Sequence, residues 1–164
     1  MVVSNRGDGT VSVIDTASLG VKATVPVCKQ PEDIAILQDN SKAFVECSGA
    51  GQVAAVDLKG AKLLALLDVG KTPVSLALKP DGGELIACNF DSDNISIIET
   101  TTNEVGNSYL IGTHPARGVV TADSSRLYVS NFGSNSVAVY DIDNGKVIAS
   151  LPVGSQPDAL ALSA

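Results

Sequence analysis

Histidine and cysteine, from which many metal and catalytic sites are built, are scarce in this sequence. The 164 residues contain one histidine, His114, which excludes any site made of several imidazole groups. The three cysteines, Cys28, Cys47 and Cys88, form no C-x-x-C motif, and an odd number cannot all pair within one chain. We therefore expect neither a cysteine-rich zinc site nor dithiol chemistry, and we expect the cysteines to be small buried hydrophobic residues.

Long apolar runs and clusters of basic residues are also missing. No stretch approaches the roughly 18 consecutive apolar residues of a membrane-spanning helix, and the first residues lack the pattern of a signal peptide. The net charge is −7 and the basic residues are scattered singly, so nucleic acid and anionic lipid are poor partners and no membrane insertion is expected. A hydrophobic content of 45% predicts a globular domain.

The most informative feature of the sequence is an internal repeat of 42 residues. Proline recurs at this interval, and each proline follows a short turn that opens with cysteine or glycine. The prolines are Pro31, Pro73, Pro115 and Pro157, and the residues that open the turns are Cys28, Gly70, Gly112 and Gly154. Four copies fill the chain, and aspartates recur with them in the turns, as at Asp39, Asp81 and Asp123.

Each copy reads as four short strands. In the last copy the apolar runs are 116–121, 126–130, 136–140 and 146–153, and turn-forming residues separate them. Apolar residues alternate along these runs, and every run is too short for an amphipathic helix. The sequence therefore predicts an all-β fold, a β-propeller built from four tandem four-stranded antiparallel blades of 42 residues.

The blades are expected to form a single domain over residues 1–164. Residue 1 corresponds to the start of a second strand and residue 164 lies just past a first strand, so pairing of the C-terminal strand with the N-terminal strands would complete the last blade. Three arrangements remain open: a closed four-bladed ring, two chains that share an eight-bladed ring, or part of a larger ring. The third is favoured, because small blades wrap most easily around a wide axis.

The second strands of the four copies read VVSN, FVEC, IACN and YVSN, at residues 2–5, 44–47, 86–89 and 128–131. These segments resemble the YVTN repeat, and the resemblance extends through residues 136–162. It implies a β-propeller of the kind found in exported or cell-surface proteins of bacteria and archaea, hence a periplasmic or cell-surface location, and it implies the fold more strongly than any function. The second copy departs from the pattern because Cys47 replaces the strand-end asparagine, and four blades are fewer than the family's usual number of about seven.

One face of the predicted propeller carries charged residues that break the repeat. The loops that lead into the innermost strands gather around the axis, and their irregular residues are candidates for ligand binding at the channel mouth. These candidates are Glu32, Asp33, His114, Arg117 and Asp158. Neighbouring loops on this face supply candidates for a partner surface, namely Arg6, Asp8, Phe90 and Phe132. Solvated turn charges are the simpler alternative for both sets.

Two short motifs partly match known metal or cofactor sites. Asp91 and Asp93 offer carboxylates at the spacing that begins a calcium loop, but Ile95 occupies the next ligand position, which favours a solvated turn. The segment 49–54 matches the dinucleotide fingerprint, but a strand follows it where the cofactor requires a helix. No cofactor is therefore expected.

These observations favour a non-catalytic binding or scaffolding module that presents a loop-rich face to a protein, a glycan or a small polar ligand. The alternative is a lactonase-like or metal-assisted hydrolase with an acidic site at the channel mouth. In that enzyme Glu32, Asp33 and Asp158 would hold the metal and His114 would act as the base. A homodimer that forms an eight-bladed ring would be a further mode of association.

Overall fold

The computed structural model describes residues 1–163, which form fifteen strands and one short 3-10 helix. The first sheet contains β1 (Val2–Asn5), β2 (Thr10–Asp15) and β3 (Gly20–Pro26), and the second contains β4 (Pro31–Ile36), β5 (Lys42–Cys47), β6 (Gln52–Asp57) and β7 (Lys62–Asp68). The third contains β8 (Pro73–Leu78), β9 (Glu84–Asn89), β10 (Asn94–Glu99) and β11 (Glu104–Leu110), with η1 (Phe90–Ser92) between β9 and β10. The fourth contains β12 (Pro115–Val120), β13 (Arg126–Asn131), β14 (Ser136–Asp141) and β15 (Lys146–Pro152).

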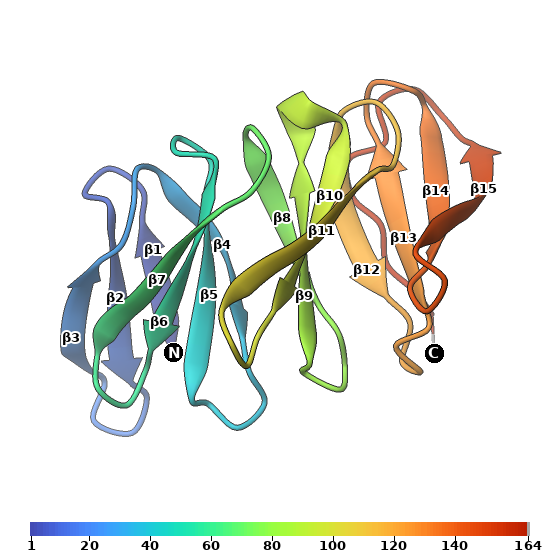
Figure 1. The fold of residues 1–164 in the computed structure, drawn as a ribbon. Coiled ribbons are helices and arrows are strands. Elements are labelled where there is room, and N and C mark those ends of the chain that lie inside the picture. The colour runs from blue at the N-terminus through green and yellow to red at the C-terminus, as the bar shows by residue number, and fades with distance from the viewer. Residues whose placement is uncertain (164) are drawn as a thin grey trace.

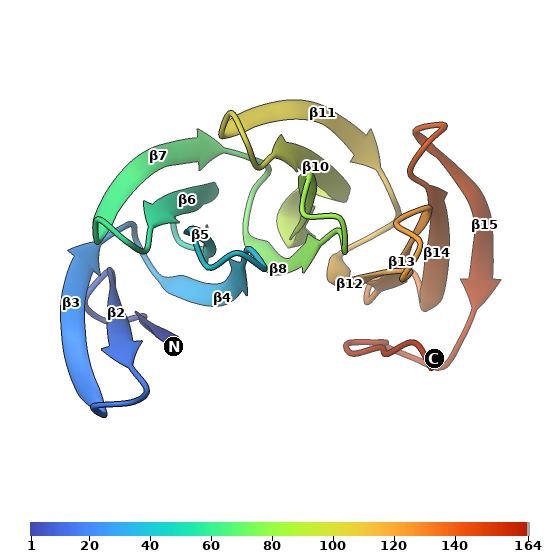
Figure 2. The same cartoon turned by 90° about the horizontal axis from the view of Figure 1, so that it is seen from below.

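Every sheet is an antiparallel meander, and the four sheets stand side by side in an arc (Figure 1). The first strands of the complete sheets, β4, β8 and β12, contact one another along the concave side, while β7, β11 and β15 form the convex side (Figure 2). The predicted all-β fold of propeller blades is confirmed. The strands of the last blade begin and end within a residue or two of the predicted runs. No helix in residues 1–163 is long and apolar enough to cross a membrane.

The two ends of the arc are incomplete. The first sheet has three strands, because β1 pairs with β2 and, among residues 1–163, no strand lies on its other side. The segment 157–163 follows β15 and belongs to no strand. The chain therefore forms an open arc, with these two parts at opposite ends of it (Figure 2). The predicted pairing between the C-terminal strand and the N-terminal strands is not made within this arc and stays a prediction.

Burial between neighbouring sheets explains the hydrophobic pattern of the strands. The middle strands of the central sheets are buried on both faces, as along Ala43–Cys47 in β5 and Leu85–Asn89 in β9. In contrast β2, at the end of the arc, alternates between buried and half-buried residues, since only one of its faces is covered. Three apolar clusters fill the three junctions between sheets, and each fully buried Val, Leu or Ile adds about 1.5–3 kcal/mol of hydrophobic free energy.

The recurring aspartates serve the turns, which accounts for their period. In the hairpin between the first and second strands, the carboxylate accepts a hydrogen bond from the backbone N–H two residues later, at 2.9, 2.9 and 3.1 Å. These residues are Asp39, Asp81 and Asp123. The backbone hydrogen bond lowers the pKa of Asp39 and Asp81, and the Thr121 hydroxyl together with Ser125 lowers that of Asp123 to about 2.

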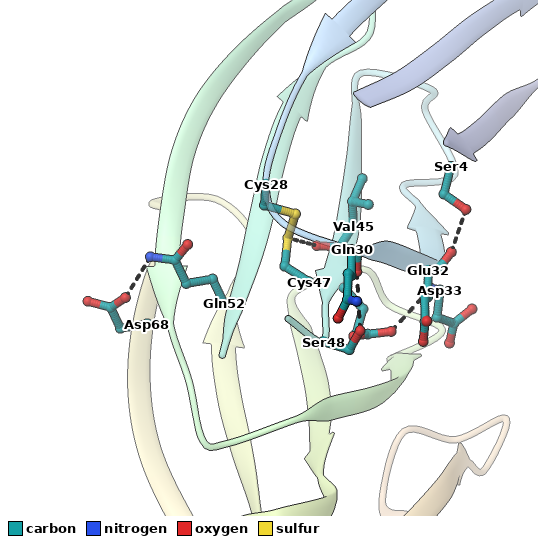
Figure 3. Close-up of a disulfide and its surroundings, with 11 residues drawn as sticks. Ser4, Cys28, Gln30, Glu32, Asp33, Val45, Cys47, Ser48, Gln52 and Asp68 are labelled. Atoms are coloured by element: carbon teal, nitrogen blue, oxygen red, sulfur yellow. Dashed lines mark hydrogen bonds between the residues drawn. A yellow bond between two sulfur atoms is a disulfide. The ribbon is translucent and has the colours of Figure 1, made fainter. Parts of the chain in front are cut away.

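Two of the cysteines form a disulfide, so the expectation that the cysteines serve only as small buried hydrophobic residues was wrong for these two. Cys28, in the loop before β4, is bonded to Cys47 at the end of β5, with 5.9 Å between the two Cα atoms (Figure 3). The two residues are far apart in sequence but adjacent in the blade, which composition alone did not show. Cys88 is free and buried, as expected, and burial raises the pKa of its thiol to about 12.

The other blades fill the two disulfide positions with glycine and asparagine. The equivalent pairs are Gly70 with Asn89 and Gly112 with Asn131. A Cβ atom added at Gly70 would lie 2.6 Å from the Cβ of Asn89, and one added at Gly112 would overlap the side chain of Asn131. A side chain at the glycine position therefore fits only where the asparagine is absent. The second blade has neither residue: Cys28 stands in place of the glycine and Cys47 in place of the asparagine.

We expect Cys28→Ser to lower the free energy of unfolding by about 3 kcal/mol, because the disulfide closes a loop of 19 residues. The double variant Cys28→Gly, Cys47→Asn should recover part of that loss, since it restores the pair that the third and fourth blades use. Urea unfolding of the three proteins measures both effects. Equal stability of the parent and Cys28→Ser would contradict a structural role for the disulfide.

Candidate functional site

The concave edge of the arc brings together charged residues from three sheets. Asp33 in β4 and Arg117 in β12 are 84 residues apart, yet Arg117 Nη1 lies 3.3 Å from Asp33 Oδ2. The same Asp33 oxygen accepts a hydrogen bond of 3.0 Å from the backbone N–H of Leu76 in β8. One carboxylate thus connects the inner strands of the second, third and fourth sheets. The ion pair is partly exposed, so it stabilises the fold by about 1 kcal/mol at most.

Glu32 points to the other neighbouring sheet. Its carboxylate forms an ion pair with Arg6, in the loop after β1, and its backbone oxygen accepts a hydrogen bond of 2.8 Å from the Ser4 hydroxyl (Figure 3). Successive side chains of a strand point to opposite faces, so Glu32 meets the first sheet while Asp33 meets the third. Arg6, considered from sequence as a partner-surface residue, therefore belongs to the charged edge.

A buried carboxyl group beside this edge was not found from the sequence. Glu46 in β5 is completely buried; its Oε2 accepts a hydrogen bond of 3.3 Å from the backbone N–H of Asp33, and its Oε1 has no partner. Burial raises the pKa of Glu46 to about 8, and the negative charges of Glu32 and Asp33 act in the same direction. The Glu46 side chain is therefore mostly protonated at neutral pH.

A comparison of the four repeats could have identified Glu46 as unusual. The equivalent residues in the other blades are small, namely Ser4, Cys88 and Ser130. Ser4 donates its hydroxyl proton to the Glu32 carbonyl, and Ser130 donates to the carbonyl of Asp158 at 3.1 Å, so two residues of this column link their sheet to the next inner segment. A glutamate in such a column breaks the pattern as clearly as the charged loop residues do.

Three aromatic rings gather on the adjoining loops. The rings of Phe90 and His114 stack with 4.5 Å between their centroids and 7° between their planes, and Phe132 lies 5.8 Å from Phe90. The backbone N–H of His114 donates a hydrogen bond of 2.8 Å to Asp93 Oδ1. His114, predicted at the channel mouth with the acidic residues, is therefore grouped with the two phenylalanines that were predicted as a partner surface.

A small cavity lies where the charged edge meets the aromatic group. It has a volume of about 180 Å³, and its lining residues are Val74, Phe90, Ala116, Arg117, Asp158 and Ala159. The cavity unites two of the predicted mouth residues, Arg117 and Asp158, with one of the predicted surface aromatics. The small side chains of Val74, Ala116 and Ala159 leave the space open.

The remaining sequence candidates have other roles. Asp91 accepts a hydrogen bond of 2.6 Å from the Thr72 hydroxyl, Asp93 serves the His114 backbone, and Asp8 lies in the exposed turn between β1 and β2. Within residues 1–163 no three His, Cys, Asp or Glu side chains lie close enough together to hold a metal ion. The acidic trio predicted as metal ligands is thus not assembled, since Glu32 and Asp33 are engaged with arginines on different sheets.

Comparison with known proteins supports the fold. No family model and no curated protein matches the sequence, so membership of the YVTN family is not shown. The structure is similar to hydrazine synthase of Kuenenia stuttgartiensis, with a TM-score of 0.85 and 25% identity over 92% of this chain and 45% of that one. It is also similar to a putative 6-phosphogluconolactonase of Bacteroides fragilis, with a TM-score of 0.69 and 19% identity over 78% of this chain and 40% of that one.

Both similar structures have propeller folds, and this chain spans less than half the length of each. The second likeness, at 19% identity, establishes the fold alone.

We predict that the stability of the protein falls as the pH rises from about 5 to 8, with a contribution from Glu46 of up to about 1.4 kcal/mol per pH unit. The folded state keeps the Glu46 proton in this range, whereas the unfolded chain has already lost it, so alkali favours unfolding. Glu46→Gln should flatten the profile.

Urea unfolding at several pH values tests this. Glu104→Gln, on the exposed outer strand β11, is the matched control and should keep the parent's slope. An unchanged slope in Glu46→Gln would show that Glu46 is not the titrating group.

Proposed function

We propose that this chain is a non-catalytic binding module that holds one small hydroxyl-bearing unit, such as the end sugar of a glycan, in the cavity lined by Phe90, Arg117 and Asp158. The observation that carries the proposal is that an aromatic residue, an arginine and an aspartate line one small hollow. A ring faces the apolar side of a sugar, while Arg117 donates hydrogen bonds and Asp158 accepts them.

The size of the cavity sets the size of the ligand. About 180 Å³ is well below the roughly 300–1,000 Å³ of pockets that enclose drug-sized molecules, so a single small unit fits and a cofactor does not. The stacked His114 holds the Phe90 ring in place, which limits the entropy lost when a ligand packs against it.

The arrangement of the charged residues supports binding over hydrolysis. A metal-assisted hydrolase needs several ligands at one point and a base within hydrogen-bond reach of the substrate. Here Asp33 is held by Arg117 and the Leu76 backbone, Glu32 by Arg6, and the His114 ring stacks against Phe90. The lactonase-like alternative would require these contacts to be rearranged.

Arg117→Ala and Asp158→Asn should each weaken binding by roughly tenfold or more, because both substitutions remove a group that lines the cavity. Isothermal titration with a panel of monosaccharides, after a glycan-array screen, measures the effect. Arg126→Ala is the matched control, since this exposed arginine lies in β13 at the opposite end of the blade.

The enzyme alternative predicts a different outcome. Calcium or zinc would raise the unfolding temperature of the parent protein, and the double variant Glu32→Ala, Asp158→Ala would lose that effect. Metal-dependent stabilisation together with lactone hydrolysis that depends on His114 would overturn the binding proposal.

A further inference from the structure

One column of the repeat holds four residues that can each donate a proton to a carbonyl group. The residues stand at the same position in the second strands of the four sheets and are buried or half-buried; they are Ser4, Glu46, Cys88 and Ser130. Hydroxyl and thiol groups donate this proton at neutral pH, whereas a carboxyl group donates only while it is uncharged. The column therefore has one common chemistry only if Glu46 is a neutral acid.

The acceptor in this column is a backbone carbonyl near the start of the next inner segment. Ser4 Oγ donates to the carbonyl of Glu32 at 2.8 Å, and Ser130 Oγ donates to that of Asp158 at 3.1 Å. Donor and acceptor are 28 residues apart in both cases. The same separation from Glu46 leads to Val74 in β8, so the Val74 carbonyl is the equivalent acceptor between the second and third sheets.

A β-bulge separates the Val74 backbone from its own sheet. The register between β8 and β9 shifts between Pro73 and Ser75, so Val74 lies opposite no residue of β9. The extra residue of a bulge is left out of the hydrogen-bond ladder. In β4 the register shifts after Pro31 in the same way, and there the Glu32 carbonyl accepts the bond from the preceding sheet. The bulge in β8 thus leaves the Val74 carbonyl available to the second sheet.

The carboxyl group of Glu46 lies where it can use this carbonyl. Its Oε2 accepts a hydrogen bond from the Asp33 N–H in β4 at 3.3 Å, just as Ser130 Oγ accepts one from the equivalent Arg117 N–H at 3.1 Å. Its Oε1 is buried and has no hydrogen-bond partner among residues 1–163. The strand β5, which carries Glu46, contacts β8 as well as β4. A proton on Oε1 satisfies this oxygen and the carbonyl of β8 together.

We propose that Glu46 positions the wall of the ligand cavity: as a neutral acid it donates its proton to the Val74 carbonyl and joins the second sheet to the third, and the cavity loses affinity when that proton is lost. Val74 lines the cavity, and so does Arg117, which is paired with Asp33. A carboxylate in place of the acid repels both the Val74 oxygen and the Asp33 carboxylate. The effect on affinity rests on the proposed function, whereas the hydrogen bond does not.

The surroundings of Glu46 favour the neutral acid. Burial raises the pKa of Glu46 to about 8. The charged groups that face it are Glu32 and Asp33 from β4 and Arg6 from the loop after β1, so two negative charges oppose one positive charge. The strand β8 has no ionisable side chain, and the only one in β6, Asp57, lies at the far end of that strand. The proton is therefore held at neutral pH and lost in mild alkali.

Carbon-13 NMR tests the hydrogen bond directly. From about pH 6 to about pH 10, the Val74 carbonyl resonance should titrate together with the Glu46 carboxyl carbon, with a common midpoint near pH 8. In Glu46→Gln the Val74 resonance should stay constant, because an amide donates and accepts at every pH. The Asp158 carbonyl, which accepts from Ser130, is the internal control and should not shift.

Two NMR results would overturn the proposal. A Glu46 carboxyl that is already ionised at about pH 6 would have no proton to donate at neutral pH. A Val74 resonance that stays constant while the Glu46 carboxyl titrates would mean that the proton is donated elsewhere.

Isothermal titration at about pH 7 and about pH 9 tests the effect on affinity, with the tightest-binding monosaccharide of the panel as the probe. The affinity of the parent should fall roughly tenfold at the higher pH, within the range usual for coupled sites. Glu46→Gln should bind equally well at both pH values, and Glu46→Met, which lacks a donor, should bind weakly at both. Glu104→Gln, on the outer strand β11, is the control and should show the parent's fall.

The possible outcomes separate this inference from the proposed function. An equal fall in affinity in the parent and in Glu46→Gln would overturn the positioning role and leave carbohydrate binding in place. If the parent binds no monosaccharide at either pH, the proposed function and the effect on affinity are both overturned, and the Val74 resonance still decides the hydrogen bond. If Glu46→Met does not fold, the comparison of the parent with Glu46→Gln decides the positioning role by itself.

Discussion

The structure depends on burial of both faces of each sheet against its neighbours. A strand such as β9, buried along Leu85–Asn89, would expose both of its faces if its blade stood alone, so the blades are stable only as a series. The same requirement places the innermost strands β4, β8 and β12 next to one another. In the described arc, the first and fourth sheets each have one neighbouring sheet, so only one face of each is covered.

The candidate site is a consequence of this arrangement. Because the inner strands are neighbours, residues separated by one or two full repeats meet, as Asp33 and Arg117 do. The alternation of side chains then sends Glu32 and Asp33 to different sheets. Glu46 occupies the junction between the second and third sheets, where it has lost solvent and retains an unpaired oxygen. The charged residues that differ between the repeats lie at the concave edge. The positions that are apolar in every repeat form the core between the sheets.

The second blade shows how a repeat can exchange one stabilising device for another. The glycine and asparagine of the third and fourth blades form a close contact, so a side chain cannot replace the glycine while the asparagine is present. Replacement of both by Cys28 and Cys47 keeps the loop before β4 tied to the end of β5 through a covalent bond. A count of cysteines could not show this pairing, because it depends on the distance between two positions that are 19 residues apart in the chain.

The sequence by itself determined the fold, the strand boundaries and the turns, because the 42-residue period and the alternation of apolar residues express local and nearest-neighbour requirements. It also identified Asp33 and Arg117 as departures from the repeat, and Phe90 as a candidate for a partner surface. Only the tertiary structure decided which departures meet: it grouped His114 with the phenylalanines, joined Cys28 to Cys47 and revealed the buried carboxyl of Glu46. The curvature of the arc is a sum of small rotations between packed sheets, and no residue pattern within one blade encodes it.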